Sequence, residues 1–328
     1  KRNYNNQKAY TNSGDSWIEI PGFKNNRKIE NLILPEKQEI EIADIVDMFK
    51  NDDDWYVDTG NPKKMTYMIY GPPGTGKSTF IKSIANTLSR DIYYMNISTI
   101  PNDEELMKLY NKVDFKRGII CIEDIDGMGS VVLKDDIPNN KELILHEDSK
   151  LDERYIERKI MKDFIEMQTK KNEGSGWSGK SESKITISGI LNMLCGNTNM
   201  DDRVMIMSTN YPDKLDDRIT ESHRVDYTLN LGYCDEYQVL RMFKIYFKKK
   251  FVQIEKDNGT SGKNDDLIKR LKNKIIPEFF TNLHENRPGI TAANLGLILS
   301  THRKDINLAI EKMMEFSKTK PIHDTNYK

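Results

Sequence analysis

The stretch Gly71-Pro72-Pro73-Gly74-Thr75-Gly76-Lys77-Ser78 matches the phosphate-loop pattern G-x-x-x-x-G-K-[ST]. Glycines let the backbone wrap closely around a ligand, so that amide N–H groups face its phosphates. Lys77 would bring a positive charge to the β- and γ-phosphates, and the Ser78 hydroxyl can ligate Mg²⁺. We expect a nucleotide to be bound by the loop and the residue that follows it: Gly71, Pro72, Pro73, Gly74, Thr75, Gly76, Lys77, Ser78 and Thr79.

The flanks of this loop fit the motif, whereas those of a second match do not. An apolar strand is expected at 65–70, and an amphipathic helix at 77–88 begins within the loop. Residues 174–181 fit the same pattern, but polar and charged residues precede and follow them. Because a motif counts only in its structural context, we expect the nucleotide at 71–79 alone.

Apolar runs recur along the first two thirds of the chain and alternate with helical patterns. Such alternation predicts an α/β fold, here a P-loop NTPase with a parallel five-stranded sheet flanked by helices. The five expected strands are 65–70, 91–97, 118–123, 203–209 and 224–231.

The chain divides by composition into three parts. Residues 1–26 are polar and are expected to form a loosely packed lead-in, with a short strand candidate at 17–20. Residues 27–231 are the α/β nucleotide-binding domain, interrupted by a charged insertion at about 129–184. Residues 232–328 read as a small all-helical lid domain, whose first helix would be capped by Asp235.

Two further strand ends bear polar side chains. The apolar strand 118–123 ends in three carboxylates, Glu123, Asp124 and Asp126, and such carboxylates can hold the Mg²⁺ shell and orient an attacking water. The apolar strand 203–209 ends at Asn210, whose amide could bond the γ-phosphate or that water. Position alone leaves Asn210 open between this role and that of a turn former.

Charge and cysteine content exclude several classes of protein. The formal net charge is −1 with 31% charged residues, which argues against a nucleic acid as partner. Three cysteines without a C-x-x-C pair predict no disulfide framework and a reducing intracellular compartment. No apolar run is long enough to span a bilayer, and the first residue is Lys1, so a processed piece is one reading.

The order of phosphate loop, acidic strand, Asn-tipped strand and the segment 215–226 resembles the AAA ATPases. Within that family the chain is most similar to the mitochondrial chaperones of the Rieske protein, which serve respiratory complex III assembly. The closer likeness lies in 31–35, 55–62, the Glu-Asp-Ile-Asp motif at 123–126, and 187–192.

The resemblance implies ATP hydrolysis with Mg²⁺ bound by Ser78, Glu123 and Asp124. It implies that Glu123 and Asp124 act at the metal and the attacking water, and that Asn210 senses the γ-phosphate. Arg224 would be an arginine finger on the neighbouring subunit's nucleotide, a role that has a use only in a ring, of about six or seven subunits. Association with an organelle inner membrane is implied only through a segment absent from this chain.

The chain departs from the common AAA pattern in places. Most AAA proteins have Asp before Glu at the strand end; here Glu123 precedes Asp124, which makes slow hydrolysis plausible. Glu221 stands where many carry a first arginine, which leaves Arg224 alone.

Two functions follow from these features. The leading hypothesis is a ring ATPase, chaperone-like, that couples ATP turnover to remodelling or translocation of a protein client. The alternative is a nucleotide-gated assembly protein with little or no turnover, which the Glu123-Asp124 order and Glu221 favour.

Overall fold

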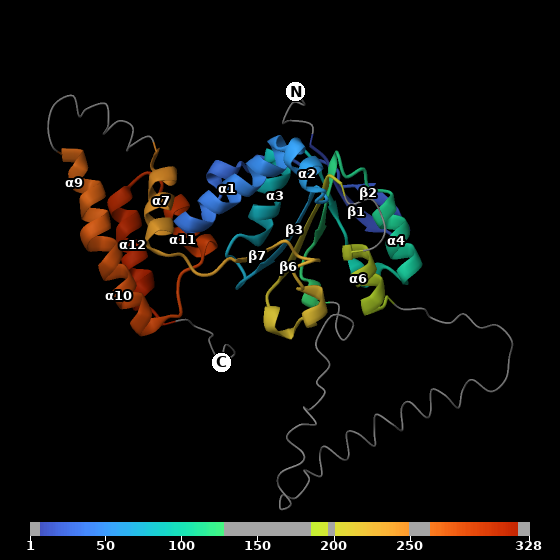
Figure 1. Cartoon of the computed structure of the whole chain (residues 1–328). Coiled ribbons are helices and arrows are strands. Elements are labelled where there is room, and N and C mark those ends of the chain that lie inside the picture. The colour runs from blue at the N-terminus through green and yellow to red at the C-terminus, as the bar shows by residue number, and fades with distance from the viewer. Residues whose placement is uncertain (1–6, 128–184, 196–200, 249–262, 321–328) are drawn as a thin grey trace, which may run out of the picture.

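The structure is a computed structural model that describes residues 7–127, 185–195, 201–248 and 263–320. Within these residues a seven-stranded sheet has the order β2-β1-β4-β5-β6-β3-β7 (Figure 1). Every neighbouring pair is parallel except β1 and β2. The strands are β1 Ala9–Ser13, β2 Ser16–Glu19, β3 Lys64–Tyr70, β4 Asp91–Tyr94, β5 Gly118–Ile122, β6 Arg203–Thr209 and β7 Tyr227–Asn230.

The five predicted strands all form, but the sheet has two more than expected. They come from the segment predicted to be a loosely packed lead-in, which forms the β1–β2 hairpin on the edge of β4. Asn12 holds the hairpin there, because its amide donates to Asn96 O (3.2 Å) and its Oδ1 accepts from Asn96 N (2.7 Å). Trp17 Nε1 donates to Leu109 O at 3.0 Å. The strand candidate at 17–20 corresponds to β2, whereas β1, whose polar residues give no hydrophobic pattern, was not predicted.

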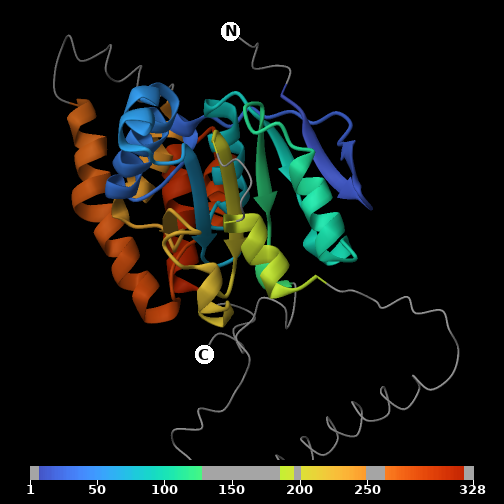
Figure 2. The ribbon, with the colours of Figure 1, turned by 45° about the vertical axis from the view of Figure 1, so that its right-hand side comes forward.

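Helices cover both faces of the central sheet (Figures 1 and 2). Alternate residues of β6 point to opposite faces: Val204 and Ile206 pack with α1 and α3, and Met205 and Met207 with α4 and α6. Strands buried on both faces are apolar at nearly every position, which is why they were predictable. The helices of this part are α1 Glu36–Asn51, α2 Asp53–Thr59, α3 Lys77–Thr87, α4 Asp103–Asn111 and α6 Ile187–Cys195, with short 3₁₀ turns at Ile29–Asn31, Ile97–Thr99, Pro212–Lys214 and Asp217–Ile219.

The C-terminal part of the chain is helical, as predicted, and has its own apolar core. Asp235 and Gln238 form a capping box at the start of the first helix, which confirms the predicted N-cap. A π turn precedes Pro277, which has no N–H to donate to the preceding turn. The elements are α7 Glu236–Tyr246, α9 Lys263–Arg270, the π turn Leu271–Ile275, α10 Ile276–Asn286, α11 Ala292–Thr301 and α12 Ile306–Lys318.

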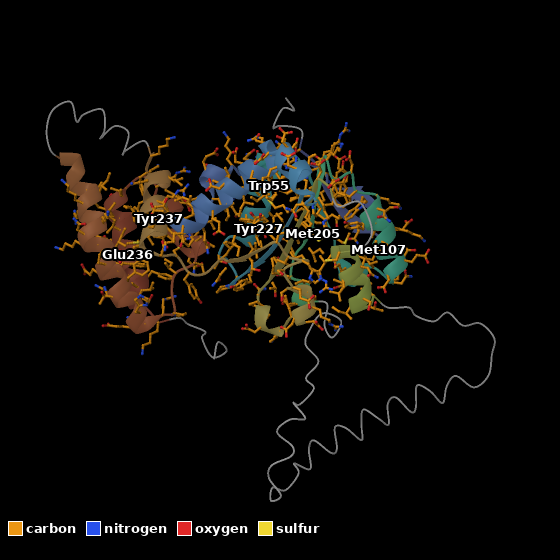
Figure 3. The ribbon with its side chains drawn as sticks, in the orientation of Figure 1. Trp55, Met107, Met205, Tyr227, Glu236 and Tyr237 are labelled. Carbon is orange, nitrogen blue, oxygen red and sulfur yellow. The ribbon has the colours of Figure 1, made fainter. Side chains whose placement is uncertain are left out.

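Polar contacts join these helices to the sheet domain next to the phosphate loop. Tyr237, labelled in Figure 3, lies on α7, and its Oη donates to Glu39 Oε2 at 3.0 Å. The Arg241 guanidinium pairs with the same carboxylate. At the start of α11, Ala293 N donates to Gly74 O at 3.0 Å. The orientation of the helical part is therefore coupled directly to the backbone of the phosphate loop.

Three predicted features lie outside the described residues: the insertion at about 129–184, a helix expected near 155–165, and the second motif match at 174–181. None of the helices that the structure describes is long and apolar enough to cross a bilayer.

Candidate functional site

The phosphate loop lies between β3 and α3 and depends on its glycines. Gly71 has φ +145°, and a Cβ built on it would lie 2.0 Å from Leu231 O, so no side chain fits. Gly74 and Gly76 also have positive φ, of +82° and +110°. The loop leads directly into α3, whose N-terminal amides and dipole favour an anion.

Lys77 joins the phosphate loop to the end of β6. Its Nζ donates to Gly71 O (2.7 Å), Pro72 O (3.2 Å) and Asn210 Oδ1 (2.7 Å). Burial lowers the pKa of Lys77, while the nearby carboxylates, Asp124 foremost, act in the opposite direction. A partly desolvated ammonium group interacts strongly with an anion.

Ser78 and Glu123 place two oxygen ligands side by side. Ser78 Oγ donates to Glu123 Oε1 at 2.6 Å, which links the start of α3 to the end of β5. Mg²⁺ prefers oxygen ligands and takes only one or two from the protein, with water and substrate phosphates completing its shell. This pair of oxygen donors therefore fits Mg²⁺, and the ligation by Ser78, Glu123 and Asp124 stays a prediction.

Asp124 has an unusual backbone and faces Asn210. Its φ is +50°, a left-handed conformation that few non-glycine residues adopt outside special sites. Its N–H donates to Ser208 Oγ at 3.2 Å, and its Oδ1 accepts from Asn210 Nδ2 at 3.3 Å. The carboxylate is exposed on the loop side, where it could orient a water molecule.

The loop lines a pocket of about 890 Å³ whose other lining residues are largely apolar. Its walls come from the segment before α1, from the phosphate loop, and from α7 and α11. Tyr246 of α7 and Gly296 of α11 lie close together, since a Cβ on Gly296 would lie 2.9 Å from the Tyr246 hydroxyl. Sequence reasoning named the loop but missed the apolar wall: Leu32, Ile33, Leu34, Met242, Ile245, Tyr246, Ala292 and Leu297.

Arg224 stands apart from this cluster. Its guanidinium pairs with Glu221 and donates to Arg218 O at 2.5 Å, and its side chain is 16% exposed. Its Nε is buried with no hydrogen-bond partner among the described residues. Of the predicted site residues, the structure thus brings Lys77, Ser78, Glu123, Asp124 and Asn210 together and leaves Arg224 outside.

Comparison with known proteins gives the same general picture as the site. Residues 67–145 match the family described as ATPase family associated with various cellular activities (AAA). The probable mitochondrial chaperone BCS1-B of Dictyostelium discoideum is 33% identical over 244 residues, which are 74% of this chain and 50% of that protein.

Two other relatives are similar to nearly the same extent. AAA-ATPase At5g40000 of Arabidopsis thaliana is 30% identical over 72% of this chain and 43% of its own length. Mitochondrial chaperone BCS1 of Danio rerio is 26% identical over 73% of this chain and 48% of its own length. The chain thus spans about half the length of these curated relatives.

Proposed function

Since this chain belongs to the AAA ATPase family and is similar to its BCS1 members, we propose that it hydrolyses ATP as one subunit of a ring. ATP turnover would drive remodelling or translocation of a protein client. The observation that supports this most is the convergence of three segments on Lys77 and Ser78. The phosphate loop, the end of β5 and the end of β6 are linked there by the Lys77–Asn210 and Ser78–Glu123 hydrogen bonds.

Each residue at this junction has a task in phosphoryl transfer. Lys77 binds the β- and γ-phosphate oxygens, for which it exchanges its present carbonyl partners. Asn210 contacts the γ-phosphate through its amide, and Asp124 accepts a hydrogen bond from the attacking water. Mg²⁺, when bound by Ser78 and Glu123 together with phosphate oxygens, neutralises charge that develops on the phosphates.

The apolar residues of the pocket suit the nucleobase. They come from the segment before α1, as Leu32 and Leu34, and from the helical part, as Tyr246 and Leu297, and these residues would hold the adenine ring. Because Ala293 N also bonds Gly74 O, a change at the phosphates is transmitted to α11. We propose 27–231 as the nucleotide-binding domain and 232–328 as a lid whose movement does the mechanical work.

The position of Arg224 supports the proposed ring. An arginine finger that does not contact the phosphate loop of its own subunit can act on the nucleotide bound to a neighbouring subunit. Repeated head-to-tail contacts between such subunits close into a ring. We propose about six or seven subunits, a protein client and no nucleic acid. The mitochondrial names of two relatives extend the proposal to a mitochondrial location, which fractionation of the parent cells tests.

A second function has its own support. Arg224 is held by Glu221, and Asp124 is one methylene shorter than the Glu usual at the catalytic position. Both features suit a protein that uses ATP to set the geometry of an assembly and hydrolyses little of it.

The experiment that separates the two is ATP turnover as a function of protein concentration. Wild type is compared with Lys77→Ala, Arg224→Ala and, as a matched control, Arg218→Ala, whose side chain is 54% exposed and paired with Asp216. Turnover that rises cooperatively and is lost in K77A and R224A, but not in R218A, supports the ring ATPase. Binding of ATP without phosphate release at any concentration rejects it and favours the nucleotide-gated assembly.

A further inference from the structure

The third carboxylate after β5 lies behind the proposed sensor. Asp126 Oδ1 accepts from Thr209 Oγ1 at 2.5 Å and from the backbone N–H of Asn210 at 3.2 Å. Thr209 is fully buried, and its Oγ1 also accepts from Tyr211 N at 3.0 Å. One carboxylate therefore fixes three consecutive residues at the end of β6.

The side chain of Asn210 needs this support. Its Oδ1 accepts from Lys77 Nζ at 2.7 Å, and its Nδ2 donates to Asp124 at 3.3 Å. One end of the amide therefore bonds a cation and the other end an anion. These two hydrogen bonds orient the amide, and the backbone of Asn210 sets the position from which the side chain reaches both partners. Of the contacts that fix this backbone, the one from β5 comes from Asp126. Asp126 is half-buried, and its hydrogen bonds in the described residues go to Thr209 and Asn210, while it acts on Lys77 only through its charge.

We propose that Asp126 is a positioning residue that holds the Asn210 amide where it reads the γ-phosphate and lines up with Asp124. The inference rests on the proposed ATP site. It predicts that loss of Asp126 impairs discrimination of ATP from ADP and the chemical step, while general nucleotide affinity is retained. A displacement of a catalytic group by about 1 Å can cost on the order of 100-fold in rate, so we expect a 10- to 100-fold fall in kcat, roughly.

The test compares Asp126→Ala, Asp126→Asn, Asn210→Ala and the double variant D126A/N210A. Calorimetry gives the affinities for ADP and for a non-hydrolysable ATP analogue, and steady-state turnover gives kcat and KM. D126A is expected to abolish the preference for the ATP analogue and lower kcat, with the ADP affinity unchanged. D126N is expected to rescue both, because its amide oxygen can accept the same two hydrogen bonds.

The double variant separates positioning from folding. If Asp126 acts through Asn210, D126A has no further effect once Asn210 is alanine. Asp305→Ala is the matched control, since that carboxylate also accepts a backbone N–H, from Asn307 at 2.9 Å, but in the helical part. D305A should lower the melting temperature and leave the ATP-to-ADP preference unchanged.

Two results overturn the inference: a D126A protein with unchanged preference and kcat, or fully additive effects in D126A/N210A. A wild-type chain that binds ATP but shows no turnover rejects the proposed ATPase instead. In that case the role of Asp126 is still tested by the calorimetric preference for the ATP analogue over ADP, because that measurement requires no hydrolysis.

Discussion

Glu221 holds Arg224 in the described chain, so replacing Glu221 with alanine should raise ATP turnover. A finger that stabilises charge on a neighbour's nucleotide has to leave its present partners first. In the structure these are the Glu221 carboxylate and the Arg218 carbonyl. Removing the carboxylate takes away the charged partner that holds the guanidinium back, and it also removes a negative charge that would repel the triphosphate.

The size of the effect follows from the exposure of the pair. Glu221 is 45% exposed and Arg224 16%, so solvent screens the pair on one side, and such ion pairs contribute about 0.5–1 kcal/mol. Because about 1.4 kcal/mol corresponds to a factor of ten, release of the finger should become roughly 2- to 5-fold more favourable. If release precedes each turnover, kcat rises by the same factor. Glu221→Gln, which keeps a hydrogen-bond acceptor, should give a smaller rise.

The assay is phosphate release at saturating ATP and at a protein concentration where assembly is complete. Arg224→Ala serves as the reference for a missing finger, and E221A/R224A should be as inactive as R224A. The reasoning is refuted if R224A is inactive and E221A leaves kcat unchanged or lowers it. If R224A retains full turnover, the finger assignment itself is wrong.

Three further predictions concern stability and reactivity. In the Lys77→Met variant, adding ATP should no longer raise the melting temperature. The melting temperature of the ATP-free variant should not be lower than that of ATP-free wild type. Burial lowers the pKa of Lys77 from 10.5. The charged side chain therefore destabilises the folded state at pH values below the folded-state pKa. The stability of wild type relative to K77M should rise as the pH rises through that pKa towards 10.5. A clearly lower ATP-free melting temperature in K77M would contradict this. Tyr67→Phe should stabilise the chain by about 1 kcal/mol in urea unfolding, because the buried Tyr67 hydroxyl has no partner among the described residues. Since burial raises the pKa of Tyr67 above its ordinary 10, only the unfolded chain ionises near pH 10, and wild type should lose stability there relative to Y67F; equal alkaline profiles would argue against it. Under native conditions a thiol reagent should modify Cys195 alone, since Cys121 and Cys234 are buried and burial raises the pKa of Cys234 to about 12. All three should react in denaturant, and native labelling of Cys121 would contradict the described core.

Much of the site was predictable because it depends on short-range patterns. The spacing of Gly71 to Ser78 and the apolar strand before it specify a loop of one kind wherever they occur together. Strands buried on both faces are continuous apolar runs, and parallel strands end at one edge, so Glu123, Asp124 and Asn210 were expected near Lys77. The structure places them there.

What the sequence left open depends on partners distant along the chain. Asn12 and Trp17 looked like parts of a loose polar segment, because the groups that satisfy them lie more than 80 residues away. The apolar wall of the pocket joins the residues before α1 to α7 and α11, which no local periodicity connects.

The sequence by itself therefore predicted the residues of the candidate nucleotide site, through a loop that depends on glycine and through polar and charged side chains at strand ends. The tertiary structure alone decided how that chemistry is held. It pairs Arg224 with Glu221 and sets Asp126 behind Asn210. The reason is physical: a side chain's partner is selected by the packing of whole elements in space, and the order of residues along the chain does not encode that choice locally.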